Sequence, residues 1–134
     1  MKKNTLYWIG LSDYDIDTAD AMLASQRYVY VVFMCHISLE KMLKACVTEL
    51  TDLDMPPKIH NLVRLAEIAS VLNSMTDEQR RFLIRLNDQQ VATRYPEELS
   101  ALFNVYTRAF VESILASTKE LRTWLRHQLP SKEP

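Results

Sequence analysis

Apolar residues recur along this chain at intervals of three and four positions, the spacing that places them on one face of an α-helix. The pattern predicts helices at about residues 6–25, 27–50, 60–72, 76–90 and 96–127, and it contains no alternation typical of a strand. The connections between these segments are short, so consecutive helices are expected to be antiparallel neighbours. The sequence therefore predicts an all-α protein, an up-and-down antiparallel bundle of four to five helices.

Proline and capping residues mark where these helices begin and end. Pro56 and Pro57 stop the second helix, because consecutive prolines cannot continue one. The segment Thr76-Asp77-Glu78-Gln79 predicts a capping box, in which the threonine hydroxyl and the glutamine side chain each satisfy a free backbone amide. Pro96 suits the first turn of the last helix. The inner face of that helix is expected to carry Leu99, Leu102, Phe103, Tyr106, Phe110, Ile114, Leu121 and Leu125.

The composition fits one helical domain and excludes several classes of protein. The 134 residues are assigned to a single domain, 1–134, with a frayed tail at about 130–134. A single glycine leaves no glycine-rich loop to cradle phosphates, which excludes P-loop and dinucleotide-binding motifs. Lysine and arginine total 16 against 17 acidic residues, a net charge of −1, so any contact with nucleic acid is expected to be local.

No segment indicates a membrane span, a secreted protein or a metal site. The chain has no uncharged apolar run of about 18 residues, and no signal peptide is expected. Cys35 and Cys46 fall in one predicted helix roughly 16 Å apart, beyond disulfide reach, which favours free core thiols in a reducing cytoplasm. The histidines lack the Glu-x-x-His spacing of metal sites in helical bundles, so neither a metal nor a cofactor is expected.

Glu40 and His36 occupy the apolar face of the second predicted helix, where a charged group needs a partner that replaces water. Candidate partners are His36, His60 and Arg94, and Arg94 is expected within about 4 Å of Glu40. One interpretation is a structural polar network of His36, Glu40, Arg94 and Tyr95. The other is a ligand site in which Lys41, Lys44, His60 and Arg94 hold a phosphate or nucleotide.

Short motifs spread over about 120 residues carry a family resemblance when they are taken in order. They are Trp8 in an acidic first helix, Cys35-His36, Glu40-Lys41, Leu43-Lys44-Ala45, Pro56-Pro57-Lys58-Ile59-His60-Asn61-Leu62, Thr76-Asp77-Glu78-Gln79, Ala92-Thr93-Arg94-Tyr95-Pro96 and Trp124-Leu125. Through them the chain resembles the HEPN domain family, the higher eukaryotes and prokaryotes nucleotide-binding domain. Each motif is weak alone, and their order and spacing carry the resemblance.

The resemblance implies an all-α bundle that often dimerises. Small family members are frequently paired with a minimal nucleotidyltransferase, many of them as toxin–antitoxin systems. Other members are metal-independent ribonucleases that use an Arg-x(4–6)-His motif at a dimer cleft. Here only Arg122 and His127 have that order and spacing, but they stand about 140° apart around a helix, away from the family's motif position. They are candidate catalytic residues, or simply cations that complement the helix dipole.

The sequence and the family resemblance leave three functions open. The favoured one is a non-catalytic HEPN-like module that binds a nucleotide, works with a nucleotidyltransferase partner, or does both. The second is a metal-independent endoribonuclease toxin that cleaves RNA, and the third is a plain helical interaction protein without a small ligand. A homodimer is also expected, because the aromatic residues exceed the needs of a small core and some of them suit an interface. These residues are Tyr7, Trp8, Tyr28, Tyr30, Tyr106 and Trp124.

Overall fold

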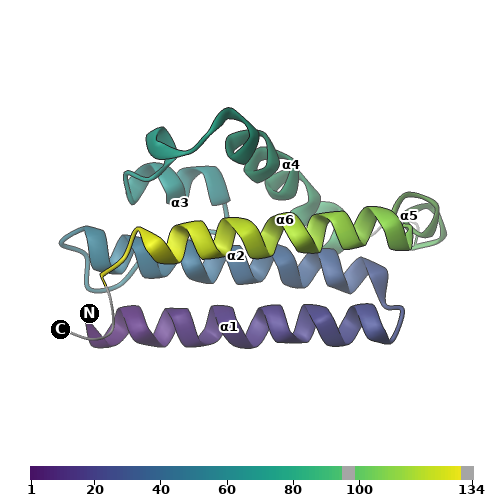
Figure 1. Ribbon diagram of the computed structural model, residues 1–134, viewed down its shortest axis with the longest axis horizontal. Helices are drawn as coiled ribbons and strands as arrows, with labels where there is room; N and C mark the ends of the chain where they lie inside the picture. The colour runs from purple at the N-terminus through teal and green to yellow at the C-terminus, as the bar shows by residue number, and fades with distance from the viewer. Residues whose placement is uncertain (95–98, 131–134) are drawn as a thin grey trace.

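The computed structural model describes the backbone of residues 1–94 and 99–130, and the side chains of residues 1–89 and 101–130. This part of the chain contains helices and no strand, so the predicted all-α fold is confirmed. The elements in order are α1 (Lys3–Ala24), α2 (Tyr28–Leu50), α3 (Leu62–Ile68), the 3₁₀ turn η1 (Leu72–Ser74), α4 (Asp77–Arg94), α5 (Leu99–Val105) and α6 (Arg108–His127) (Figure 1).

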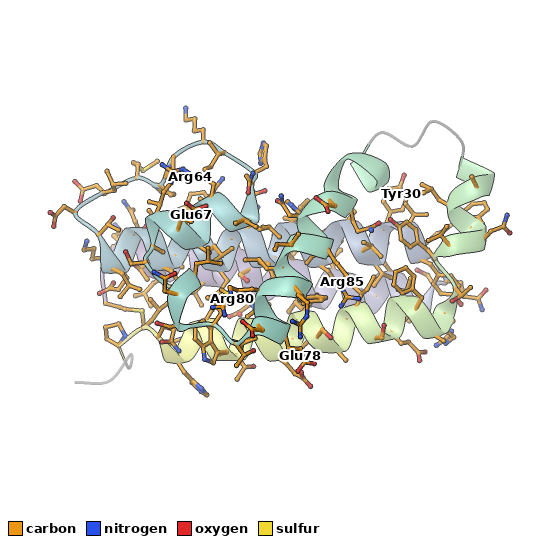
Figure 2. The ribbon with its side chains drawn as sticks, turned by 90° about the horizontal axis from the view of Figure 1, so that it is seen from above. Tyr30, Arg64, Glu67, Glu78, Arg80 and Arg85 are labelled. Atoms are coloured by element: carbon orange, nitrogen blue, oxygen red, sulfur yellow. The ribbon has the colours of Figure 1, made fainter. Side chains whose placement is uncertain are left out.

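Helix α2 is the centre of the bundle. It packs against α1 on one side, against α3 and α4 on another, and against α6 along its length (Figure 1). Seen from above, α3 and α4 lie over α2 while α6 runs alongside it (Figure 2). Most side chains of α2 between Cys35 and Thr48 are consequently buried, including polar ones. A charged residue in this stretch therefore has to find its partner inside the protein.

Helices α1 and α2 form an antiparallel hairpin joined by residues 25–27. Gln26 takes a left-handed backbone conformation, with φ of 62°, and the Arg27 amide donates to the Met22 carbonyl at 2.8 Å. Midway along the hairpin, the Ser12 hydroxyl donates to the Ser38 carbonyl at 2.7 Å, and the Ser38 hydroxyl donates to the Ser12 carbonyl at 2.9 Å. This buried reciprocal pair fixes the register of the two helices.

The beginning of α4 is built as the sequence predicts. The Gln79 amide donates to the Thr76 hydroxyl at 3.1 Å, and the Thr76 amide donates to the Gln79 side chain at 2.9 Å, which confirms the capping box. Arg80 adds a link to η1 by donating to the carbonyl oxygens of Leu72 and Met75 at 3.2 and 2.6 Å. Side chains at the start of α4 thus hold the turn that precedes this helix.

The last predicted helix is in fact two helices, α5 and α6, separated at Tyr106 and Thr107. Thr107 is extended, and its hydroxyl accepts the Phe110 amide at 3.3 Å, so it caps α6. Tyr106 is buried and its hydroxyl donates to Gln89 on α4. The break shifts the helical phase, and the inward position predicted for Phe103 is wrong: its side chain is 60% exposed.

Both cysteines are free and buried on α2, as the sequence predicts. Of the aromatic residues expected at a surface, Tyr106 belongs to the core, whereas Tyr7 and Tyr30 are exposed. Among the helices the structure describes, none is both long enough and apolar enough to cross a membrane.

Candidate functional site

Glu40 is buried within α2 and is surrounded by basic side chains. Lys44, one turn further along the same helix, donates to Glu40 Oε2 at 3.2 Å. His60, in the segment that precedes α3, places Nδ1 3.0 Å from Oε1 and 3.1 Å from Oε2. His36 Nδ1 lies 3.9 Å from Oε1. We call these four residues the Glu40 cluster, and it satisfies the requirement for a partner that the position of Glu40 imposes.

Lys44 is turned into the protein rather than toward solvent. Its side chain is only 8% exposed, and its Nζ lies 5.5 Å from the centre of the Trp8 ring on α1. The ammonium group therefore sits between a carboxylate and the face of an indole, both of which stabilise its positive charge. Lys44 thus makes these contacts inside the bundle, whereas the sequence suggests it as a ligand contact.

His60 is the member of the Glu40 cluster that reaches the surface, with a side chain that is 52% exposed. Because a carboxylate only accepts, Nδ1 is the nitrogen that carries the proton toward Glu40. The neighbouring backbone is held by two asparagines. Asn61 accepts the Arg64 amide at 3.0 Å and caps α3, and Asn87 on α4 accepts the Leu62 amide at 2.8 Å. The imidazole is thus fixed in place while one of its faces meets solvent.

Lys41 also has an internal partner. Its Nζ lies 3.5 Å from Oδ2 of Asp15 on α1, and both side chains are largely buried. Burial raises the pKa of the Asp15 carboxyl, an effect that the nearby Lys41 ammonium opposes. Lys41 therefore links α2 to α1 in a different place from the Glu40 cluster.

Arg94 and Tyr95, which the sequence assigns to the same network, lie outside the residues whose side chains are described. The expected approach of Arg94 to Glu40 therefore stays a prediction. His36 is buried against α2's neighbours, with 1% of its side chain exposed.

The two candidate catalytic residues of the last helix have different surroundings. Arg122 is 16% exposed and bridges α6 to α1: Nη1 donates to the Ser12 hydroxyl at 2.6 Å, and Nη2 donates to Asp13 at 3.0 Å. His127 is the exposed final residue of α6. Arg122 thus extends the buried Ser12 and Ser38 pair into a link among three helices, which the sequence pattern did not suggest.

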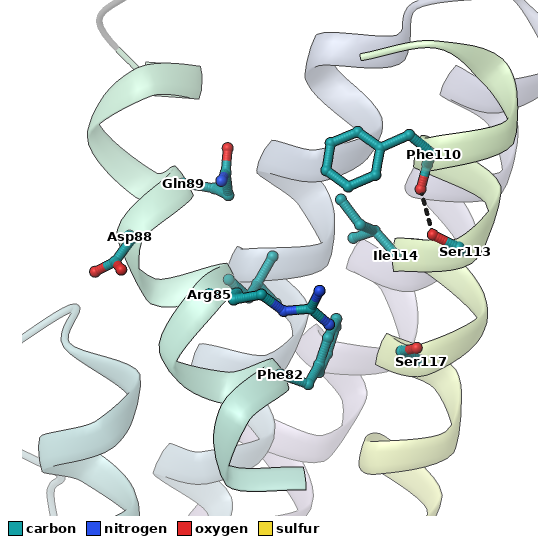
Figure 3. A pocket seen from close by; sticks show the side chains of 9 residues that line it. Phe82, Arg85, Asp88, Gln89, Phe110, Ser113, Ile114 and Ser117 are labelled. Carbon is teal, nitrogen blue, oxygen red and sulfur yellow. Dashed lines mark hydrogen bonds between the residues drawn. The ribbon is translucent and has the colours of Figure 1, made fainter. Parts of the chain in front are cut away.

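A separate pocket of about 150 Å³ lies between α4 and α6. Phe82, Leu86, Phe110 and Ile114 supply apolar walls, and Arg85 reaches into the space from α4, opposite Ser117 (Figure 3). The Arg85 guanidinium lies 6.0 Å from the centre of the Phe82 ring. Figure 2 shows the same arginine directed toward α6. The pocket is separate from the Glu40 cluster, and it offers one cation in an apolar setting.

No group of three or more histidine, cysteine, aspartate or glutamate residues in the described ranges is arranged to hold a metal ion.

The architecture defines an all-helical bundle with a polar cluster buried on its central helix. A family model described as HEPN domain matches residues 5–128, and the chain belongs to this family. The fold is similar to a crystal structure described as ST0689, an archaeal HEPN homologue, with a TM-score of 0.74. The two chains are 18% identical, and the match covers 97% of this chain and 100% of the other, a level of identity at which the likeness concerns the fold alone. No curated protein matches the chain.

Proposed function

We propose that this HEPN domain protein is a binding module that holds a nucleotide through its phosphates, with His60 as a direct contact. The observation that carries the proposal is the bond between the buried Glu40 carboxylate and Nδ1 of the half-exposed His60 imidazole, at 3.0 Å. This bond fixes the orientation of the ring and commits one nitrogen to the protein. The other nitrogen, Nε2, is then the atom that meets a ligand.

An anion is the ligand that suits this arrangement. In the imidazolium form both ring nitrogens donate, one to Glu40 and the other to a phosphate placed at Nε2. Lys44 donates to Oε2 of the Glu40 carboxylate, so Glu40 keeps an ionic partner when His60 also binds a ligand. His60 is therefore a hydrogen-bond donor whose orientation is fixed by Glu40, unlike a surface histidine without such a partner.

The nucleotidyltransferase partner belongs to the same proposal and is supported by the family resemblance. A module that presents a bound nucleotide or an exposed segment to such an enzyme needs no reaction chemistry of its own. This agrees with the separate positions of Arg122 and His127, which lie on an interhelical bridge and at a helix end. Co-purification with the product of a neighbouring nucleotidyltransferase gene tests this part.

The binding itself is tested by calorimetry with ATP, GTP, CTP and UTP. The variants are His60→Gln and, as a matched control, His127→Gln, which changes another exposed histidine. Loss of one charge-assisted hydrogen bond costs roughly 1.5–3 kcal/mol, so His60→Gln is expected to weaken binding about tenfold or more. The control is expected to bind as the unchanged protein does. Absence of binding to all four nucleotides at millimolar concentration, or equal binding by both variants, contradicts the proposal.

The second candidate function is a metal-independent ribonuclease, and the same Glu40 and His60 pair favours it. A buried carboxylate that orients a solvent-facing imidazole is the arrangement of a general base, the group that would take the proton of an RNA 2′-hydroxyl. RNA cleavage in the presence of EDTA, measured on the same two variants, separates the possibilities. Cleavage that disappears only in His60→Gln would assign the reaction to the Glu40 cluster. Cleavage that disappears only in His127→Gln would assign it to the end of α6.

A further inference from the structure

The pocket between α4 and α6 has an apolar interior and a positive charge at its mouth. Phe82, Leu86 and Ile114 line the interior, and each of these side chains is at most 7% exposed. Phe110 closes one side of the space from α6 (Figure 3). Arg85 is exposed, and its side chain extends from α4 toward α6. The pocket therefore joins a buried apolar surface to one cation at the boundary with solvent.

The guanidinium group of Arg85 is available to a ligand. No ion pair or hydrogen bond engages it among the residues whose side chains are described. Asp77, at the start of α4, pairs with Arg80 instead, and Asp88 is directed away from the pocket (Figure 3). Ser117 lines the same space from α6, and its hydroxyl has no hydrogen bond within that part of the chain either. Two hydrogen-bonding groups on opposite walls can therefore meet the same ligand.

The volume of the pocket limits the ligand to a small molecule. It measures about 150 Å³, and an apolar cavity of about 150 Å³ accommodates a molecule the size of benzene. A nucleotide is much larger than this, so the pocket is not a second site of the kind proposed at His60. Phe82 and Phe110 suit a flat ring, which aromatic side chains contact by offset stacking or edge to face.

An adjoining hollow of about 230 Å³ limits the charge of the ligand. It shares Phe82, Arg85 and Ser117 with the pocket, and Glu78 and Glu120 line it as well. Both glutamates are exposed, and Arg85 is the only cation among the described residues that line either space. These acids repel a second negative charge that one arginine cannot balance. A carboxylate, with one charge, therefore fits better than a phosphate monoester, which carries nearly two.

We propose that the pocket between α4 and α6 binds a small monocarboxylate with a compact apolar body, a molecule of the size of benzoate. The apolar body lies against Phe82, Phe110 and Ile114, and the carboxylate lies at the mouth. Arg85 donates to both carboxylate oxygens, the bidentate geometry that a guanidinium favours, and Ser117 donates a further hydrogen bond. The proposal is independent of the nucleotide site, since none of these residues belongs to the Glu40 cluster.

Titration of the isotope-labelled full chain with benzoate, followed by NMR chemical shifts, tests the binding and locates it. A dissociation constant of about 0.1–1 mM is expected for a ligand of so few atoms. The shift changes are expected to concentrate around Arg85 and Ser117. Benzyl alcohol keeps the ring without the charge, and acetate keeps the charge without the ring. Each is expected to bind about tenfold more weakly or less, because each loses one of the two kinds of contact.

Variants assign the binding to the pocket. Arg85→Gln removes an exposed charge without a partner, so the protein is expected to fold normally and to bind benzoate about tenfold more weakly. Its affinity for benzyl alcohol should not change. Arg64→Gln, at an arginine on α3 that is 60% exposed, is the matched control and should bind benzoate as the unchanged protein does. Ser117→Leu fills the space from α6 and should weaken both ligands, whereas His60→Gln should affect neither.

Three results would overturn the proposal. The first is the absence of shift changes with benzoate up to about 10 mM. The second is equal benzoate affinity in Arg85→Gln and in the unchanged protein, because the cation would then take no part. The third is binding of phenyl phosphate more tightly than benzoate, which would contradict the choice of a single negative charge.

Discussion

Lys44 and Glu40 form an ion pair inside the bundle, with 3.2 Å between Nζ and Oε2 and less than a tenth of either side chain exposed. The two residues are one turn apart on α2, so the pair adds nothing to the connection between helices by itself. His60 and Trp8 make that connection, since one contacts the carboxylate and the other lies below the ammonium group. The pair is therefore the point at which the segment before α3, the central helix and α1 meet.

Removing one member of this pair is expected to cost more than removing both. Lys44→Met leaves the buried Glu40 with the half-exposed His60 and the more distant His36, and Glu40→Leu leaves a buried ammonium. Each change should therefore lower the free energy of unfolding by about 3 kcal/mol. The double variant should lose less than the sum of the two, by at least about 1 kcal/mol. Urea unfolding of all four proteins measures this coupling, and strictly additive losses would contradict it. Lys41→Met, at the more exposed pair with Asp15, is expected to cost under about 1 kcal/mol.

Arg122 is expected to act in stability rather than in chemistry. Arg122→Met removes its hydrogen bonds to Ser12 and Asp13 while keeping most of the apolar side chain, and should cost about 1.5–3 kcal/mol of unfolding free energy. Asp13→Asn should cost less, because Asp13 is mostly exposed and can still accept through its amide oxygen. Chemical denaturation compares the two, and equal losses would show that the bond to Ser12 contributes little.

The capping box at the start of α4 is expected to contribute measurably to stability. Thr76→Ala removes the acceptor for the Gln79 amide and should lower the free energy of unfolding by about 1 kcal/mol. Thr76→Ser keeps a hydroxyl at the same position and should change it by a few tenths of a kcal/mol at most. Thermal and urea unfolding both report the difference, and similar losses in the two variants would argue against a role for the hydroxyl.

The two cysteines should make the protein less stable in alkali. Burial raises the pKa of Cys35 and of Cys46 to about 12, whereas an exposed thiol in the unfolded chain titrates near about 8.5. The unfolded chain therefore loses these protons first, and the stability present below about pH 8.5 is lost as the pH rises toward 12. Unfolding measured from pH 7 to 10.5 should show a decline that is smaller in Cys35→Ala and Cys46→Ala. Ellman's reagent at pH 8 should react with neither thiol until denaturant is added.

Local signals in the sequence predicted local structure well. Proline placement and the Thr76 to Gln79 spacing identified helix boundaries because capping involves residues three positions apart. Helical periodicity identified α2 as a buried helix and Glu40 as a residue in need of a partner. His60, one of the three partners considered, contacts Glu40 in the structure, while the Arg94 alternative concerns side chains that are not described.

The pattern of apolar and polar residues could not predict contacts between segments that are far apart in the sequence. Arg122 and its partner Ser12 are 110 positions apart, and nothing in either segment identifies the other. The break between α5 and α6 was missed for a different reason: Leu102, Phe103, Tyr106 and Phe110 fit one continuous helix equally well. Tyr106 is instead buried and donates to Gln89 of α4, a tertiary contact that the helical pattern does not encode.

The hairpin of α1 and α2 also bears on how fast the chain folds. Only residues 25–27 separate these two helices, so the contacts between them close short loops at small entropic cost. We expect this hairpin to be formed in the transition state for folding. Conservative replacements at its centre, such as Ser38→Ala, should then slow refolding, whereas Thr107→Ala at the start of α6 should mainly accelerate unfolding. Stopped-flow kinetics in urea distinguish the two effects, so the order in which the helices assemble is open to measurement.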